Sequence, residues 1–114
     1  MRGFEFFTHE ENSVAVALVM GQIDAAVADD FDGKMKALLE KPDCRVVLDC
    51  RGLTYLSSRA IGLLVGFRQV AAKSNGRFVL CNLTDRLIEI TTPIDLTRMV
   101  ETYPSRAAAV AALR

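Results

Sequence analysis

The sequence has no excess of charge of either sign and no long apolar run. Lysine plus arginine and aspartate plus glutamate each number 14 in 114 residues, so the formal net charge is zero. A nucleic-acid-binding domain needs a basic excess or a basic stripe to contact phosphates. No apolar stretch approaches the roughly 20 residues that cross a bilayer, and residues 1–5 lack the charged-then-apolar pattern of a signal peptide. We therefore expect a cytoplasmic protein that neither binds nucleic acid nor inserts into a membrane.

Residues that commonly act as catalytic bases or metal ligands are also scarce. His9 is the only histidine, and the three cysteines (Cys44, Cys50 and Cys81) form no CxxC pair and lie in or beside apolar runs. Cysteines of this kind are usually buried and reduced. A nucleophilic serine needs a positioned base, and the sequence has neither a Gly-x-Ser-x-Gly elbow nor a phosphate-binding glycine loop followed by Lys-Ser/Thr. We expect no enzyme, no metal and no cofactor.

What the chain does have is the composition of one globular domain, residues 1–114. Apolar residues make up 51% and charged residues 25%, which is typical of a folded rather than a disordered chain. Runs rich in β-branched and apolar residues predict strands at residues 4–8, 13–20, 45–50 and 77–82, with a polar turn at 9–12 and a short edge strand near 99–102. Helical spacing and capping residues predict a helix of about four turns between Asp24 and Lys41, and helices at 58–73, from 84 to just before Pro93, and from 105 to 113.

This order of elements predicts an α/β fold. Strands joined by helices run parallel through right-handed crossovers, and the first two strands should form an antiparallel hairpin. We expect a mostly parallel sheet of four to five strands with about four helices. Residues 21–24 should end the second strand, with Asp24 capping the next helix. Because Asp24 and Asp49 end or follow strands, we expect both carboxylates at the same sheet edge as Ser58.

The predicted helix at residues 58–73 is the most informative segment. Ser57 is placed to cap it, and residues 60–67 are apolar or small on every side, although a helix packed on a sheet needs only one apolar face. Gly62 and Gly66 lie four residues apart, and an interior glycine costs about 0.5–1 kcal/mol relative to alanine. Close approach of another backbone would offset that cost. Either a neighbouring helix of the same fold or a partner protein could supply it, and both remain open.

Ser58 is the residue at which this helix surface could be switched. A helix N-terminus accommodates anions, and a phosphate there would add about −1.5 to −2 charges beside the apolar surface. Asp24 and Asp49 would repel it, whereas Arg59 could act as a local counter-ion. The host could then tolerate a phosphate that a docked partner could not.

Three segments, in order and spacing, resemble one known family over nearly the whole chain. They are Gly21-Gln22-Ile23-Asp24, Val46-Val47-Leu48-Asp49, and Tyr55-Leu56-Ser57-Ser58-Arg59-Ala60-Ile61-Gly62. The chain resembles the STAS family of anti-sigma-factor antagonists. The resemblance implies that Ser58 is phosphorylated by an anti-sigma factor with serine-kinase activity, a GHKL-type ATPase, and dephosphorylated by a PP2C-type phosphatase. It also implies that the unphosphorylated form binds the anti-sigma factor.

The chain departs from the family pattern at three positions beside the phosphoacceptor. Ser57, Arg59 and Ala60 replace an aspartate, a small hydroxyl residue and a glycine. Arg59 could stabilise a phosphate, or it could mark a member that docks without being phosphorylated. The predicted partner surface, with Asp49 in support, comprises Asp24, Ser57, Ser58, Arg59, Gly62, Leu63 and Gly66.

Two other roles would use the same elements. The domain could be a subunit that docks on the ATPase of a lipid ABC transporter, or a scaffold in a stress-sensing complex, in both cases through the same helix. More distantly, it could bind a small ligand in a pocket at the strand ends near Asp24, Asp49 and Ser58.

Overall fold

The computed structural model describes residues 3–114, which form five strands, five α-helices and one turn of 3-10 helix. The strands are β1 (Phe4–Glu11), β2 (Val14–Ile23), β3 (Arg45–Leu56), β4 (Arg77–Cys81) and β5 (Thr102–Tyr103). The helices are α1 (Ala28–Leu39), α2 (Ser58–Lys73), α3 (Asp85–Thr91), η1 (Thr92–Ile94), α4 (Leu96–Met99) and α5 (Arg106–Leu113).

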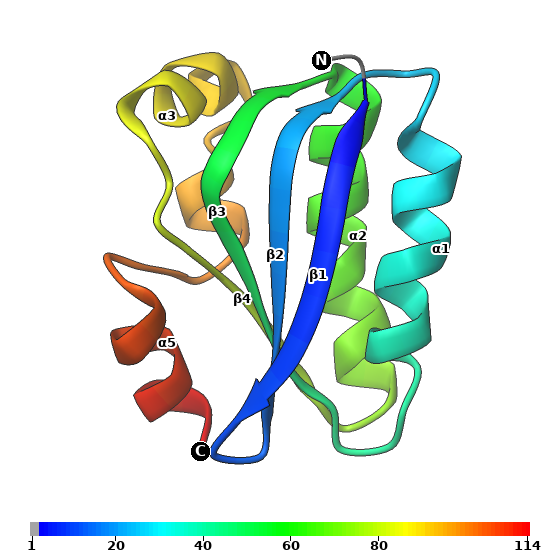
Figure 1. Ribbon diagram of the computed structural model, residues 1–114, viewed down its shortest axis with the longest axis vertical. Coiled ribbons are helices and arrows are strands. Elements are labelled where there is room, and N and C mark those ends of the chain that lie inside the picture. The colour runs from blue at the N-terminus through cyan, green and yellow to red at the C-terminus, as the bar shows by residue number, and fades with distance from the viewer. Residues whose placement is uncertain (1–2) are drawn as a thin grey trace.

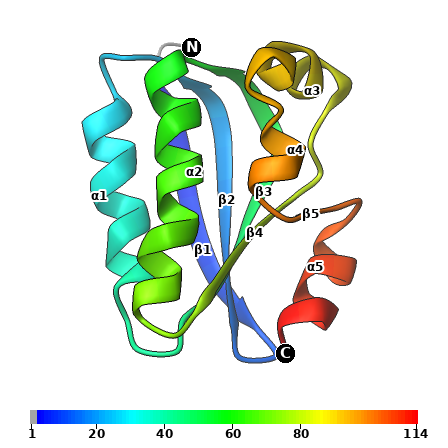
Figure 2. The ribbon, with the colours of Figure 1, turned by 180° about the vertical axis from the view of Figure 1, so that it is seen from behind.

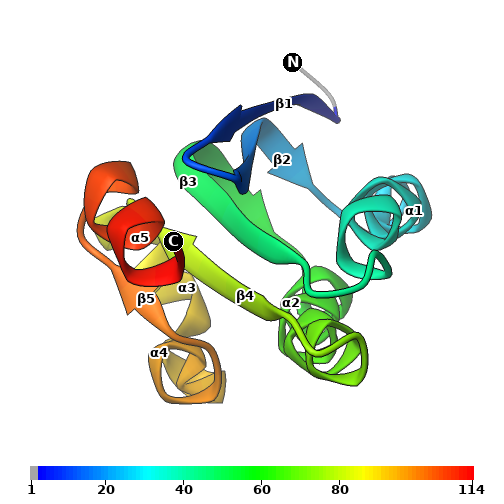
Figure 3. The ribbon, with the colours of Figure 1, turned by 90° about the horizontal axis from the view of Figure 1, so that it is seen from below.

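The strands form one sheet in the order β1-β2-β3-β4-β5 (Figure 1). β1 and β2 pair antiparallel, and all the other neighbours pair parallel. Helices α1 and α2 lie side by side on one face of the sheet, and α5 lies on the opposite face (Figures 2 and 3). The α/β fold with an N-terminal hairpin and a mostly parallel sheet is therefore confirmed.

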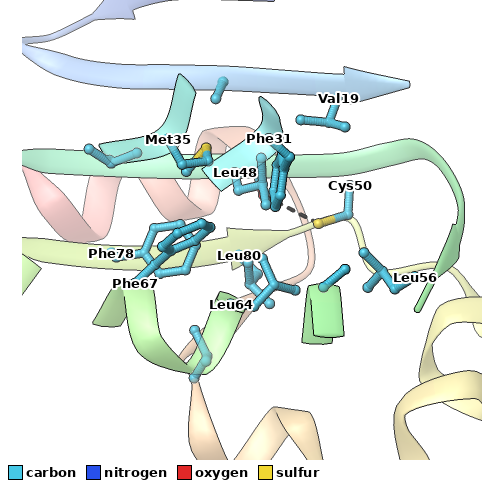
Figure 4. Close-up of a cluster of buried hydrophobic side chains, with 14 of the residues drawn as sticks. Val19, Phe31, Met35, Leu48, Cys50, Leu56, Leu64, Phe67, Phe78 and Leu80 are labelled. Atoms are coloured by element: carbon cyan, nitrogen blue, oxygen red, sulfur yellow. Dashed lines mark hydrogen bonds between the residues drawn. The ribbon is translucent and has the colours of Figure 1, made fainter. Parts of the chain in front are cut away.

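The larger of two cores lies between the sheet and helices α1 and α2. Four phenylalanines cross it edge to face: Phe4 contacts Phe31, Phe31 contacts Phe67, and Phe67 contacts Phe78, with ring centroids 5.7–5.8 Å apart. Figure 4 shows Phe31, Phe67 and Phe78 among the aliphatic side chains of this core. Such pairs contribute about 0.5–1.5 kcal/mol each beyond the area they bury. This core holds α1 and α2 in fixed orientations and so determines which residues face outward.

A smaller core lies under α5 on the other face. Ala109, Val110 and Leu113 of α5 pack against valines of the sheet, namely Val14, Val16, Val47 and Val79. Because α5 is only eight residues long, it covers part of this face, and β1 and β2 remain largely uncovered in Figure 1.

The first hairpin turns later than the sequence predicts. β1 continues through residues 9–11, and the turn consists of Asn12 and Ser13, both in the left-handed region with φ of 51° and 67°. Two left-handed residues between antiparallel strands form the turn type that matches the twist of a hairpin. The predicted polar turn at residues 9–12 is therefore wrong. His9, Glu10 and Glu11 are the last three residues of β1, so their side chains point to alternate faces of the sheet.

Strands β2 and β3 are also longer than predicted. Gly21 does not end β2 but lies in it with φ of +106°, next to shifts in the register between β2 and β3. Gly52 of β3 is opposite Met20, and a Cβ at Gly52 would lie 2.8 Å from the Met20 side chain. Both glycines look like strand breakers in the sequence, yet here they accommodate bulges within continuous strands.

The helix starts follow the sequence more closely, with one exception. Ser57, Thr84 and Ser105 each cap a helix by accepting a hydrogen bond from the backbone N–H three residues later. Asp24, however, caps a turn that precedes α1: its Oδ1 accepts from the N–H groups of Ala26 (2.9 Å) and Val27 (3.3 Å). The short edge strand expected near 99–102 is present as β5 but begins only at Thr102, and Leu96–Met99 before it form a one-turn helix. Between residues 3 and 114, no helix is long and apolar enough to cross a bilayer.

Candidate partner-binding site

The N-terminus of α2 is fixed by the ends of β2 and β3. Ile23 and Leu56 are paired in register, and the Ser57 N–H donates to the Ile23 carbonyl at 2.9 Å. The Ser57 hydroxyl accepts from the Ala60 N–H at 3.1 Å and caps the helix. Asp24 follows Ile23 directly, so the structure brings Asp24 and Ser57 to the same sheet edge, as expected.

Ser58 is the first residue of α2 and is exposed. The next side chain, Arg59, pairs its guanidinium with the Asp29 carboxylate of α1. Both partners are well exposed, at 48% and 83%, and exposed ion pairs of this kind contribute little to stability. Arg59 directly follows Ser58 in the chain and can be released from Asp29 at little cost.

Gly62 and Gly66 have no structural neighbour on their outer side. A Cβ built on either glycine would meet nothing within 4 Å. By contrast, a Cβ at Gly76 would lie 2.4 Å from the Cys44 carbonyl oxygen, so that glycine is required by packing. Tight packing of α2 against another helix of the same fold is thus excluded as the reason for Gly62 and Gly66.

These glycines belong to one continuous surface of α2. Ser58, Gly62, Gly66 and Gln69 recur at helical spacing and are exposed or half-buried, and the half-buried Leu63 and Val65 flank them. We refer to these six residues as the α2 outer face. Sequence reasoning identified all of them except Val65 and Gln69. Counting three residues along the helix from Gly62 and from Gly66 would have found both.

Asp49 does not belong to this surface. It lies in the middle of β3, is 1% exposed, and alternates with Leu48 and Cys50, which face α1 and α2. Its Oδ1 accepts from the Arg51 N–H (3.0 Å) and from the Asn82 side-chain amide (3.1 Å). The prediction that Asp49 lies at the edge beside Ser58 is wrong, because β3 runs on for seven residues to Leu56. Asp49 instead links β3 to the end of β4.

The cysteines are buried, as expected. Burial raises the pKa of the Cys81 thiol to about 12, and the neighbouring Asp49 carboxylate acts in the same direction. Burial likewise raises the pKa of Cys50 and of Cys44. Such thiols stay protonated and unreactive. Across residues 3–114, no three His, Cys, Asp or Glu side chains are grouped so that they could hold a metal ion.

The order of elements, together with a capped helix that presents an exposed serine and two outward glycines, matches one family. The family model described as STAS domain matches residues 8–109. The chain belongs to the STAS domain family. A relative in Bordetella bronchiseptica carries the name "Putative anti-sigma factor antagonist BtrV". It is 26% identical over 106 residues, which cover 90% of this chain and 89% of that protein.

Solved structures share the fold at lower identity. An anti-sigma factor antagonist from Mycobacterium paratuberculosis has a TM-score of 0.84 at 20% identity, covering 98% of this chain and 95% of that chain. The Bacillus cell fate determinant SpoIIAA in its phosphorylated form has a TM-score of 0.67 at 14% identity, covering 98% and 100%. Part of the murine anion transporter Slc26a9 has a similar fold, with a TM-score of 0.74 at 16% identity, and the match covers 92% of this chain and 18% of that chain.

Proposed function

We propose that this STAS domain is an anti-sigma factor antagonist that docks on an anti-sigma factor through the α2 outer face. One observation carries the proposal: two interior glycines of a 16-residue helix face open space. Each costs the free chain about 0.5–1 kcal/mol relative to alanine. Close approach of a partner backbone over Gly62 and Gly66 would offset this loss of helix stability in the complex.

The residues around the glycines suit a protein partner. Leu63 and Val65 stay half-buried in the free domain, so a partner that covers them gains apolar burial without first unfolding anything. The core beneath α2 is closely packed, with Ile61, Leu64 and Phe67 at 4% exposure or less. The surface is therefore rigid before it binds, which limits the entropy lost on docking.

Phosphorylation of Ser58 is the off-signal in this proposal. The hydroxyl is exposed at the helix N-terminus, where a phosphate is favoured by the helix dipole and can attract Arg59. The same phosphate would lie next to the docked partner, and its two charges would have to lose water there. We propose that the anti-sigma factor is a GHKL-type serine kinase that acts on Ser58 and that a PP2C-type phosphatase reverses the reaction. The relative SpoIIAA exists in a phosphorylated form, which supports this route.

Bulky substitutions on the α2 outer face test the docking surface. The partner to use is the anti-sigma factor whose gene lies nearest the gene for this chain. Gly62→Leu and Gly66→Leu should each weaken binding to it at least tenfold in titration calorimetry, because the added side chain would hold the partner backbone away from the α2 backbone. Gly33→Leu is the matched control: Gly33 is an interior glycine of α1 and also has nothing within 4 Å. Equal affinities of all three variants for the anti-sigma factor would overturn the proposal that the α2 outer face is the docking surface. Binding of a transporter ATPase through the same face would replace the proposed partner.

Intact-mass analysis after co-expression with that kinase tests the phosphorylation step. We expect one phosphate on the wild-type chain and none on Ser58→Ala. Arg59→Ala should still be labelled if Arg59 only stabilises the product. If Ser58→Ala still incorporated phosphate, the phosphoacceptor would be another hydroxyl and not Ser58.

A further inference from the structure

The outer edge of β1 is open. β1 is the terminal strand of the sheet, and among residues 3–114 its eight residues pair on one side only, with β2 (Figure 3). Proteins usually protect such an edge with charged side chains, especially lysine, or with proline, a bulge or a short strand. The charged residues of β1 are three glutamates, whose positions therefore restrict how the edge can pair. β1 has no lysine, proline or glycine, and its register with β2 has no shift. Phe7 is 51% exposed on it. The opposite edge, β5, is only two residues long.

The hairpin turn determines which backbone groups of β1 point outward. In a hairpin with a two-residue turn, the residues flanking the turn form a hydrogen-bonded pair, and such pairs then alternate along the strands. Glu11 and Val14 flank the turn, so odd-numbered residues of β1 direct their N–H and C=O toward β2. The Gln22 N–H donates to Gly3 at 2.9 Å, which continues this alternation. The even-numbered residues, from Phe4 to Glu10, therefore offer their backbone groups to the free edge.

We infer that β1 pairs with β1 of a second copy of this chain, antiparallel about a two-fold axis through Phe7. In this register the even-numbered residues pair by hydrogen bonds, with Phe6 opposite Thr8 of the second copy. Phe7 lies opposite itself in a non-hydrogen-bonded pair, where side chains are closest and aromatic pairs are favourable. Glu5 lies opposite His9 of the second copy.

Charge excludes one of the two neighbouring registers, with the axis at Thr8. The facing pair of Phe7 rings favours this register over the other, with the axis at Phe6, in which Glu5 would lie opposite Phe7. β1 carries three glutamates, and like charges directly opposite each other destabilise a sheet. With the axis at Thr8, Glu5 would face Glu11 of the second copy. With the axis at Phe7, no glutamate faces another glutamate. Glu11 already pairs with Arg106 (3.3 Å) and with His9 (2.5 Å) in its own chain, whereas none of the ion pairs formed within residues 3–114 includes Glu5. His9 would therefore lie between Glu11 of its own chain and Glu5 of the second copy.

The resulting dimer has one continuous sheet of ten strands. Helix α1 lies between β1 and α2 (Figure 3), so the α2 outer face of each copy stays uncovered. The inference therefore does not depend on the proposed function, and a dimer could dock one partner on each copy.

Engineered cysteines test the register directly. The three native cysteines are buried, so Phe7→Cys supplies the one exposed thiol. Non-hydrogen-bonded partners have Cα atoms about 4.5 Å apart, which a disulfide can bridge. Mild oxidation of Phe7→Cys should give a covalent dimer on a non-reducing gel. Glu5→Cys or His9→Cys alone should not, because equivalent positions are then offset by four residues, about 14 Å along the strand. An equimolar mixture of those two variants should cross-link.

Ala37→Cys is the collision control, because Ala37 is exposed and lies on α1 rather than on β1. Sedimentation equilibrium of the unaltered chain should show a concentration-dependent dimer, and circular dichroism checks that each variant is folded. A wild-type chain that stays monomeric would overturn the inference. Cross-linking of Phe7→Cys no faster than Ala37→Cys would also overturn it, as would Glu5→Cys that cross-links alone as well as in the mixture.

Discussion

Helices α1 and α2 bury similar inner faces but present different outer faces. Both pack on the same side of the sheet, and each contributes one phenylalanine, Phe31 or Phe67, to the same aromatic chain. On its outer side, α1 exposes charged residues around Gly33, namely Asp29, Asp30, Lys34 and Glu40. The six residues of the α2 outer face include no charged side chain, although Arg59, Arg68 and Lys73 are exposed elsewhere on α2.

This difference shows what an outward glycine can and cannot indicate. Gly33 alone is consistent with a solvated helix surface, because its charged neighbours interact favourably with water. Gly62 and Gly66 lie four residues apart between half-buried Leu63 and Val65. It is the combination of lost helix propensity and apolar surroundings, rather than the glycines themselves, that indicates a partner.

Truncating the two inner faces should have the largest effect, and it should be equal for the two helices. Phe31→Ala and Phe67→Ala each remove a fully buried ring, which costs about 3–5 kcal/mol of unfolding free energy. Urea denaturation followed by circular dichroism measures this loss. A loss of unfolding free energy confined to Phe67→Ala would mean that α1 is not part of the same cooperative core. The inner faces of α1 and α2 would then not be equivalent.

A negative charge on the outer faces should separate the two helices next. Ser58→Asp should weaken binding to the anti-sigma factor at least tenfold, or about 1.4 kcal/mol, while leaving the fold intact, because a carboxylate suits a helix N-terminus. Ala37→Asp, on the charged outer side of α1, should change the affinity less than twofold. Titration calorimetry compares the two, and equal affinity for wild type and Ser58→Asp would count against phosphate as the off-signal.

Local pattern predicted most of this fold because it depends on periodicity and caps. Helix α2 begins after Ser57 and ends at Lys73 as predicted, since one strong cap and a Ser-Asn-Gly stop mark its ends. The C-terminal ends of β2 and β3 were predicted too early, because a glycine in a sequence can mark either the end of a strand or a bulge within it. Gly21 and Gly52 looked like breaks, but the register shifts between β2 and β3 keep both inside strands.

The candidate site was predictable to the extent that it lies on one helix. Ser58, Gly62 and Gly66 share a helix face by spacing alone. Asp49 was misplaced because its position relative to Ser58 depends on how far β3 extends, which is a property of strand pairing rather than of the local sequence. Whether Gly62 met another helix or open space could likewise be decided only in three dimensions.

Replacing the outward glycines by alanine should give the smallest change in unfolding free energy. The change is informative because stability should rise while binding weakens. Gly62→Ala and Gly66→Ala add a methyl group to open space, so each should raise the unfolding free energy by about 0.5–1 kcal/mol. Gly33→Ala should stabilise the chain by a similar amount. Only the two α2 variants should also weaken binding to the anti-sigma factor, because the methyl group lies where the partner backbone must approach. Thermal denaturation and titration calorimetry on the same three variants measure both quantities. Stabilisation without loss of affinity at Gly62 and Gly66 would show that α2 and α1 are equivalent surfaces and that the glycines serve no partner.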